Sequence, residues 1–203
     1  MRITSITRQV KNPERVNIFL AGKYSFSLSL DELIRERLKK DQELTEAELK
    51  KLKKISADGK LRSRSLEWLL GRPHSTREFK DYLRKKQVEA ELTESLIDEF
   101  TTKGYLDDEK FAQWFTDLRQ RKYKSRRAIK AELAGKGISG ELAEQVLSQS
   151  NANEEEAIKE IIAKKSKSSR YRDDSLRLMK YLTSQGFNYS LVKKCLAEHK
   201  TED

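Results

Sequence analysis

The chain has 203 residues, of which 36% are apolar and 37% are charged, and its mean hydropathy is −0.84. This composition favours a large surface over one thick core, so we expect an extended helical array. The 43 lysines and arginines against 33 acidic residues give a net charge of +10, which suggests an acidic or nucleic-acid partner. The single cysteine excludes an intramolecular disulfide, and no apolar run suits a secretory or membrane segment, so we expect a cytoplasmic protein without membrane contact.

Residues 1–59 predict a small β-meander followed by a helical extension. Residues 3–10, 16–20 and 24–30 have strand-like apolar patterns separated by short turn signals. Asp31 is expected to begin a short helix, and Thr45 with Glu48 three residues later predicts a capping box before the next one. Gly59 is the predicted end of this N-terminal segment.

From residue 60 onward, one apolar pattern occurs three times, at offsets of 50 and then 49 residues. Each copy has a helix, a one-residue break, an apolar residue and a second helix, and a further apolar helix precedes it. Matching positions are Phe79, Leu83, Gln87 and Val88; Ile129, Leu133, Gly137 and Ile138; and Leu178, Leu182, Gly186 and Phe187. The predicted fold class is therefore all-α, with three tandem three-helix repeats over 60–106, 107–152 and 153–203.

The stretch from Gly104 to Ala112 predicts a structural joint between the first two repeats. Gly104 is expected to end one helix, the next two residues bring apolar groups inward, and Asp107 or Asp108 caps the following helix. Acids at a helix start could also hold a metal, but no companion ligands are visible, so capping is favoured. The joint consists of Gly104, Tyr105, Leu106, Asp107, Asp108 and Phe111.

The sequence offers no catalytic set. Only His74 and His199 could act as bases at neutral pH, and the only thiol, Cys195, occupies a predicted core position. A phosphate-binding glycine loop and paired-cysteine metal spacing are both absent from the sequence. We therefore predict a binding protein without catalytic residues, metal or cofactor.

Two basic runs contain no acidic residue. The first lies between Asp117 and Glu132 and includes Tyr123, and the second lies between Glu160 and Asp173. Their cations are Arg119, Arg121, Lys122, Lys124, Arg126, Arg127 and Lys130 in the first run, and Lys164, Lys165, Lys167, Arg170 and Arg172 in the second. Such density suits phosphate contacts or an acidic protein groove, although a run of charge is equally common on a solvated face. Their corresponding places in successive repeats favour a binding role.

Three motifs give the chain a resemblance to a known family. They are Gly104–Ala112, the preceding Arg72–Phe79, and the following Ser125–Leu133 with Lys136–Ile138. Over residues 66 to 138 the sequence resembles the RecX family of bacterial recombinase regulators. The resemblance implies an elongated, curved molecule of tandem three-helix units that binds the RecA nucleoprotein filament along its groove. It also implies a regulator, not an enzyme, that mainly inhibits the ATPase, strand-exchange and coprotease activities of RecA.

The expected partners are the RecA filament and single-stranded DNA, with double-stranded DNA as a further candidate, and we expect a monomer. We hypothesise that both basic runs face the filament, so that reversing Arg126 and Arg127 to Glu would abolish inhibition without unfolding the helices. The alternative is a stand-alone helical DNA-binding module, because three-helix units resemble helix-turn-helix arrangements. Tight sequence-selective duplex binding would support that alternative.

Overall fold

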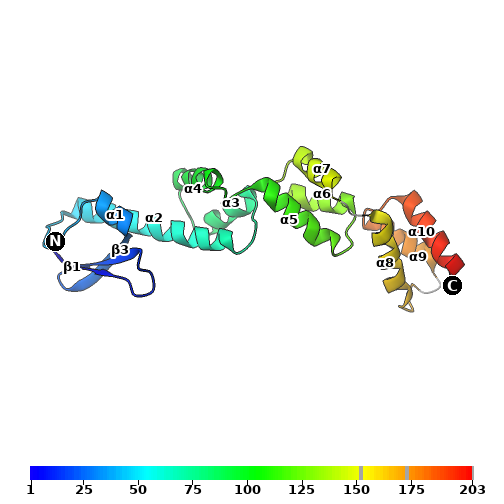
Figure 1. Ribbon diagram of the computed structural model, residues 1–203, viewed down its shortest axis with the longest axis horizontal. Coiled ribbons are helices and arrows are strands. Elements are labelled where there is room, and N and C mark those ends of the chain that lie inside the picture. Colours follow the sequence, from blue (N-terminus) through cyan, green and yellow to red (C-terminus); the bar gives the residue numbers. More distant parts are fainter. Residues whose placement is uncertain (151–152, 172–173, 203) are drawn as a thin grey trace. The chain divides into compact units, whose positions relative to one another are not determined.

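The computed structural model describes residues 1–150, 153–171 and 174–202. It divides into two compact units, Met1–Gly71 and Arg72–Asp203. Within the described residues, a three-stranded sheet is followed by ten helices (Figure 1), which confirms the predicted mostly helical fold with a small N-terminal meander. The predicted end of the second repeat, Ala152, and the predicted site residue Arg172 lie outside the described ranges.

The first unit is built on an antiparallel sheet in the order β1-β2-β3, formed by β1 (Ile3–Arg8), β2 (Arg15–Leu20) and β3 (Lys23–Ser29). Ala21 and Gly22 connect β2 and β3 with φ angles of 48° and 75°, as a tight two-residue hairpin requires. Helix α1 (Leu30–Arg35) begins one residue before Asp31, because Ser29 and not Asp31 forms its capping box. The buried residues of the sheet join Leu49 and Leu52 of α2 (Glu46–Leu70) in one core.

Helix α2 continues through Gly59, where the sequence predicts a boundary. The predicted capping box of Thr45 and Glu48 is present at its start. Gly59 is buried, and a Cβ at this position would overlap the carboxylate of Glu32, a buried residue of α1. The glycine therefore allows two helices to approach closely and does not interrupt the chain. The division between the two units falls after Gly71 instead.

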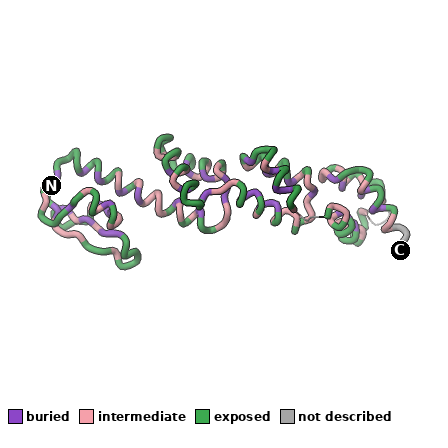
Figure 2. Tube along the Cα trace, turned by 45° about the horizontal axis from the view of Figure 1, so that its top comes forward, coloured by how far each residue is buried: buried purple, intermediate pink, exposed green. Residues whose placement is uncertain are grey.

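The second unit contains the remaining helices. They are α3 (Thr76–Lys85), α4 (Ala90–Thr102), α5 (Asp108–Gln120), α6 (Arg126–Gly135), α7 (Gly140–Gln149), α8 (Glu154–Ser166), α9 (Ser175–Ser184) and α10 (Tyr189–Glu202). Helices α5 to α7 enclose one apolar core and α8 to α10 another, and Figure 2 shows buried residues recurring along these helices. The matching positions Phe79, Ile129 and Leu178 are at most 2% exposed, as the repeat pattern predicts. The division of residues 60–203 into three domains stays a prediction.

Successive repeats are connected by a recurring serine bond. Ser75 and Ser125 are both fully buried and cap α3 and α6 by accepting hydrogen bonds from Glu78 N and Ala128 N. Each hydroxyl also donates, at 2.7 Å, to a backbone carbonyl about 60 residues later, that of Lys136 for Ser75 and that of Gln185 for Ser125. One hydroxyl thus provides a hydrogen-bond partner for a backbone N–H at the start of one helix and for a backbone carbonyl at the end of another.

A carboxylate bond recurs beside each serine bond. Asp108 Oδ1 accepts from Thr76 N, the first residue of α3, and Glu154 Oε1 accepts from Arg126 N, the first residue of α6, both at 2.7 Å. Asp107 caps its own helix α5 by accepting from the backbone N–H groups of Glu109 and Lys110, and the latter bond is the main cause that lowers its pKa. The sequence prediction of capping is therefore met at Asp107, whereas Asp108 caps the helix of the preceding repeat.

We expect Asp107→Ala and Asp108→Ala each to lower the free energy of unfolding by about 1 kcal/mol, because each removes a helix cap. Only the Asp108 variant should weaken the connection between repeats. Hydrogen exchange separates them: Asp107→Ala should increase exchange at the start of α5, and Asp108→Ala at the start of α3. Loss of activity without loss of stability in the double variant would contradict a purely structural role.

The break residues of the second and third repeats are glycines because the preceding repeat packs against them. Gly137 and Gly186 have φ angles of 86° and 90°. A Cβ on Gly137 would lie 2.7 Å from Arg77 Cβ, and one on Gly186 would lie 2.8 Å from Ser125 Oγ. Gln87 occupies the matching position in the first repeat with φ 57° and is exposed. Of the three matching break positions, only that of Gln87 therefore has room for a side chain.

A partly buried carboxylate, that of Glu78, links the first repeat to the second. Glu78 Oε1 accepts from Lys136 Nζ at 2.8 Å, and Glu78 Oε2 accepts from Arg72 Nη1 at 2.9 Å and lies 3.1 Å from His74 Nδ1. Burial raises the pKa of Glu78, but the hydrogen bonds and charges of Arg72 and Lys136 outweigh it and lower the pKa to about 2. Because this carboxylate is engaged elsewhere, Ser75 caps α3 without the reciprocal bond that a capping box would require.

Candidate functional site

Both basic runs lie in the second unit. The first covers the end of α5, the turn that follows it and most of α6, and the second covers the end of α8 and residues beyond it. Lys164 and Lys165 belong to α8, which continues to Ser166. The polar stretch that begins at Lys164 is therefore partly helical, and its first two lysines are held on a regular element.

Several cations of the first run form contacts that stabilise the fold. Arg119 Nε lies 2.5 Å from a Glu132 oxygen as an ion pair without hydrogen-bond geometry, and its guanidinium lies 4.5 Å from the centre of the Phe115 ring. Arg126 Nη1 donates to the carbonyl of Leu147 at 2.9 Å. This places Arg126 between α6 and the end of α7, so it is a structural residue.

Glu144 forms ion pairs with two cations of this run. Lys130 Nζ lies 2.7 Å and Arg126 Nη2 lies 3.5 Å from its oxygens. A hydrogen bond from Lys130, the largest cause, and the charge of Arg126 lower the pKa of the exposed Glu144. Lys130 and Glu144 are about half exposed, and ion pairs between exposed side chains contribute little to stability. Lys130 can therefore change partners at low cost, unlike Arg126.

Three cations of the first run point to solvent. Arg121, Lys122 and Arg127 are exposed, and within the described part of the chain none of them forms an ion pair. They lie at the turn between α5 and α6 and in the first turn of α6. These exposed cations are the part of the run that is available to an acidic partner.

The structure brings the two runs together at one pocket of about 260 Å³. Lys122 and Lys124 line it from the first run, and Lys164 and Lys165 line it from the second. The pocket lining contains no acidic residue and no arginine. Tyr181 of α9 also lines the pocket, and no local sequence pattern could have placed it there. We call this site the lysine pocket.

Tyrosine rings hold the second pair of lysines in place. Lys164 Nζ lies 4.2 Å from the centre of the Tyr123 ring, and Lys165 Nζ lies 4.8 Å from that of Tyr181. An ammonium group over an aromatic face is attracted to it, so these contacts position the charges without neutralising them. Tyr123 lines the pocket and adopts a left-handed backbone conformation with φ 53°.

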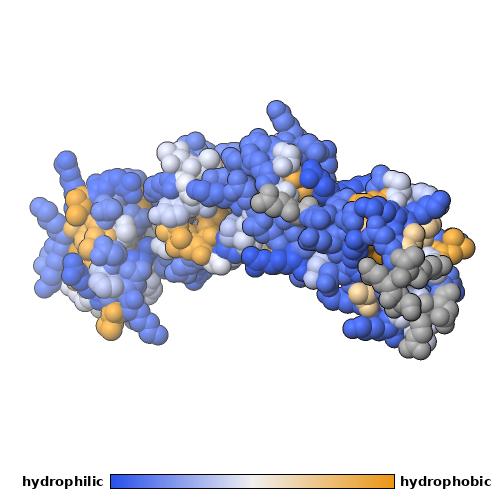
Figure 3. Space-filling view, turned by 45° about the vertical axis from the view of Figure 1, so that its right-hand side comes forward, coloured by the Kyte–Doolittle hydropathy of each residue, from blue (hydrophilic) through white to orange (hydrophobic). Residues whose placement is uncertain are grey.

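The described end of the second run is exposed to solvent. Lys167 and Arg170 are exposed, and the Arg170 guanidinium lies 5.7 Å from the centre of the Tyr171 ring. Figure 3 shows a face of the molecule that is hydrophilic over most of its area, with separate apolar patches. Charged and polar groups therefore dominate what a partner would meet on this face.

The groups considered for catalysis lie in structural positions. His74 is buried beside Glu78, and His199 Nε2 lies 3.2 Å from Ser166 Oγ. Cys195 is 1% exposed in the core of α8 to α10, and burial raises the pKa of its thiol. Among the described residues, no group of three potential ligands could hold a metal ion, and no helix is long and apolar enough to cross a membrane.

Comparison with known proteins places the chain in a family. Residues 1–45 match the model described as regulatory protein RecX N-terminal domain, and residues 107–147 match that of the RecX second three-helix domain. The chain is 34% identical over 201 residues to regulatory protein RecX of Bacillus pumilus strain SAFR-032, covering 97% of this chain and 76% of the relative. It is 32% identical over 207 residues to that of Listeria monocytogenes serotype 4a strain HCC23, covering 100% of this chain and 77% of the relative.

Solved structures agree with this placement. A crystal structure of regulatory protein RecX matches with a TM-score of 0.74 and 25% identity, over 95% of this chain and 98% of the other. The crystal structure of RecX from Lactobacillus salivarius shares the fold with a TM-score of 0.59 and 20% identity, over 70% of this chain and 95% of the other. With identities above 30% across the whole chain, the protein belongs to the RecX family of regulatory proteins.

Proposed function

We propose that this protein binds the RecA nucleoprotein filament and modulates it, mainly by inhibiting RecA ATPase, strand exchange and coprotease activity. It then acts in the cytoplasm as a regulator of homologous recombination, DNA repair and the SOS response, and not as an enzyme. Membership of a family of regulatory proteins supports a regulatory role. The observation that carries the filament proposal is the set of exposed cations Arg121, Lys122 and Arg127, which lack acidic partners within the described residues.

The exposed cations suit a polyanionic partner for an electrostatic reason. Unpaired charge on a surface raises the rate of encounter with a surface of opposite sign and fixes the orientation of docking. A filament that contains single-stranded DNA presents regularly spaced phosphates, and three-helix units in series offer regularly spaced contacts. The other described cations of the two runs remain candidates for the same surface, except Arg119 and Arg126, which the fold uses.

The proposal predicts that the double variant Arg121→Glu and Arg127→Glu retains its helices but inhibits the filament at least about tenfold less well, a change of about 1.4 kcal/mol in binding. Neither residue takes part in an ion pair within the described residues, so the fold should tolerate the change. The measurement is ATP hydrolysis by the cognate RecA on single-stranded DNA during titration of the protein, with circular dichroism at 222 nm as the test of folding.

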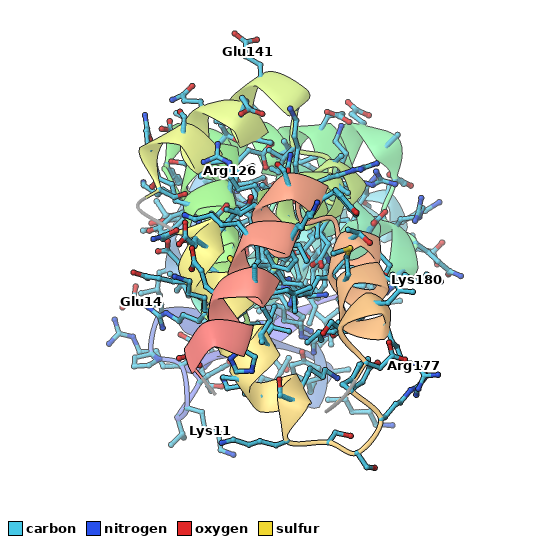
Figure 4. The ribbon with its side chains drawn as sticks, turned by 90° about the vertical axis from the view of Figure 1, so that its right-hand side faces the viewer. Lys11, Glu14, Arg126, Glu141, Arg177 and Lys180 are labelled. Carbon is cyan, nitrogen blue, oxygen red and sulfur yellow. The ribbon has the colours of Figure 1, made fainter. Side chains whose placement is uncertain are left out.

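A matched control has the same change in charge elsewhere in the second unit. Lys180 and Lys193 are exposed residues of α9 and α10, and Lys180 projects outward from its helix in Figure 4. Lys180→Glu with Lys193→Glu should inhibit nearly as well as the unmodified protein. Full inhibition by a folded Arg121 and Arg127 variant would refute this assignment.

The structure changes the expectation for Arg126. Reversing it places a carboxylate against the carbonyl of Leu147 and the carboxylate of Glu144, so lost stability would accompany any lost inhibition. Arg126 is therefore unsuitable as a functional probe. Binding to DNA without RecA, measured at the same salt concentration, distinguishes the filament regulator from the alternative function. Tight sequence-selective duplex binding without ATPase inhibition would identify a stand-alone DNA-binding module.

A further inference from the structure

We propose that the lysine pocket is a binding site for a phosphate group. The inference rests on the proposed function in that both assign a binding role to the two basic runs. Lys122 belongs to both sets of cations, but Arg121 and Arg127, which test the proposed function, do not line the pocket. Its lysines come from the turn after α5 and from the end of α8. A bound anion would therefore contact two consecutive repeats at once.

The charge of the pocket favours an anion. Four lysines line it, and no carboxylate does; they are Lys122, Lys124, Lys164 and Lys165. Two of them have an acidic neighbour outside the pocket: Lys124 lies 4.0 Å from Glu132, and Lys164 lies 3.5 Å from Glu160. The Lys164 pair is exposed and compensates charge only weakly, and the Lys124 pair is partly exposed and, at 4.0 Å, at the limit of an ion pair. The repulsion among the lysines is relieved by a negative group that enters the pocket.

The number of cations favours phosphate over carboxylate. Arginine recognises carboxylates and phosphates alike through two parallel hydrogen bonds, whereas lysine acts as a point charge with three donors, and several lysines together suit the several oxygens of a phosphate. Only lysines provide the positive charge in this lining. A tetrahedral phosphate can accept from several lysines at once, and a protein carboxylate offers just two oxygens. Recognition of an acidic protein is therefore the less suitable use.

The size of the pocket points to a small charged group. Its volume of about 260 Å³ lies below the roughly 300–1,000 Å³ of pockets that enclose drug-sized ligands. A phosphodiester of a single strand fits this chemistry, and so does the phosphate chain of a free nucleotide or polyphosphate. The two sources share the phosphate oxygens and differ in whether a polymer extends beyond the pocket.

The test measures binding to two probes without RecA. Inorganic tripolyphosphate is titrated by calorimetry, and a fluorescent oligothymidylate is titrated by anisotropy. The double variant Lys164→Gln/Lys165→Gln is compared with the control double variant Lys180→Gln/Lys193→Gln. The control removes the same number of charges outside the pocket. Glutamine is as good a helix former as lysine, so α8 should persist. Lys122→Gln with Lys124→Gln tests the opposite side of the pocket if the first variant fails to fold.

We expect each pocket variant to bind at least one probe about tenfold more weakly, and the control variant to bind within about threefold of the unmodified protein. Loss for the oligonucleotide alone identifies a strand phosphodiester, loss for tripolyphosphate alone identifies a free polyphosphate, and loss for both supports either source. For the oligonucleotide, the slope of log affinity against log salt should fall by about 1.4, because two phosphate contacts each contribute about 0.7 on single strands.

Two outcomes would overturn the phosphate site. One is binding of both probes by the pocket variants as strong as that by the control. The other is displacement of the probes by oligoglutamate as effectively as by a phosphate chain of the same charge, which would indicate an acidic protein partner. These assays contain no RecA, so they can refute the phosphate site while the ATPase test of Arg121 and Arg127 supports the proposed function. The reverse result is equally distinguishable.

Discussion

Replacing Gly137 with alanine is expected to lower the free energy of unfolding by about 2–5 kcal/mol. Two effects add at this position. The φ of 86° is strained for any residue with a Cβ, at a cost of about 1–2 kcal/mol. The new methyl group would also lie 2.7 Å from Arg77 Cβ, and forcing such overlap into packed structure costs typically 1–3 kcal/mol. Urea unfolding followed by circular dichroism measures the loss.

Gly104 separates these two effects. Its φ of 71° is also left-handed, but a Cβ there would meet nothing within 4 Å. Gly104→Ala should therefore show the backbone cost alone, about 1–2 kcal/mol. In a second control, Arg77→Gly removes the opposing Cβ, so the combination with Gly137→Ala should be less destabilised than the sum of the single variants. Equal losses for Gly104→Ala and Gly137→Ala would argue against tight packing between the repeats.

Glu78→Gln is expected to destabilise the protein by about 1–3 kcal/mol at pH 7, because Arg72 and Lys136 would face a neutral amide. The side chain of Glu78 is 14% exposed, so solvent screens the cluster only in part. The variant should also change the pH dependence of stability. Thermal unfolding of both proteins between pH 7 and pH 3 is the appropriate measurement.

The sign of the pH effect follows from the two states of Glu78. Its pKa falls from an ordinary 4.5 to about 2 in the folded protein, so the unfolded chain takes up the proton first as the pH falls. The stabilisation from Glu78 is complete above about pH 5 and is lost progressively towards pH 2. Glu78→Gln should lose less stability over this range. An unchanged pH profile in the variant would show that the cluster contributes little.

Glu94→Gln is the matched control for this substitution. Glu94 pairs with Lys80 at 3.1 Å, but its side chain is 67% exposed. Exposed pairs contribute about 0–1 kcal/mol, so this variant should be close to the unmodified protein at every pH. The difference between the two variants then reports on burial and on the two cations that share Glu78, and not on the loss of a negative charge as such.

Local patterns predict much of this fold because local physics determines those elements. The apolar period places Phe79, Ile129 and Leu178 in the core, and the capping box at Thr45 starts α2. Gly59 shows where local reasoning fails. A glycine within a helix costs about 1 kcal/mol relative to alanine, which favours a break, but the approach of Glu32 to Gly59 decides the outcome.

The candidate site was less predictable for the same reason. A run of basic residues does not reveal which cations the fold uses, because their partners lie far along the chain. Arg126 donates to Leu147, 21 residues away, and Lys136 reaches Glu78 over 58 residues. The convergence of Lys122 with Lys165 likewise depends on how consecutive repeats pack. The sequence shows where the charged residues lie along the chain. Only the tertiary structure shows which of them form contacts within the fold and which remain available to a partner.

The serine bonds give the array of repeats a polarity. Each has a donor end, the serine hydroxyl, and an acceptor end, a carbonyl beside a glycine. The first repeat has the exposed Gln87 at its acceptor end, and the third has Asp174 in place of a serine at its donor end, where its side chain accepts a hydrogen bond from Arg177 N. The second repeat alone combines Ser125 with Gly137, so it is the unit whose duplication would lengthen the array while keeping the same joint chemistry.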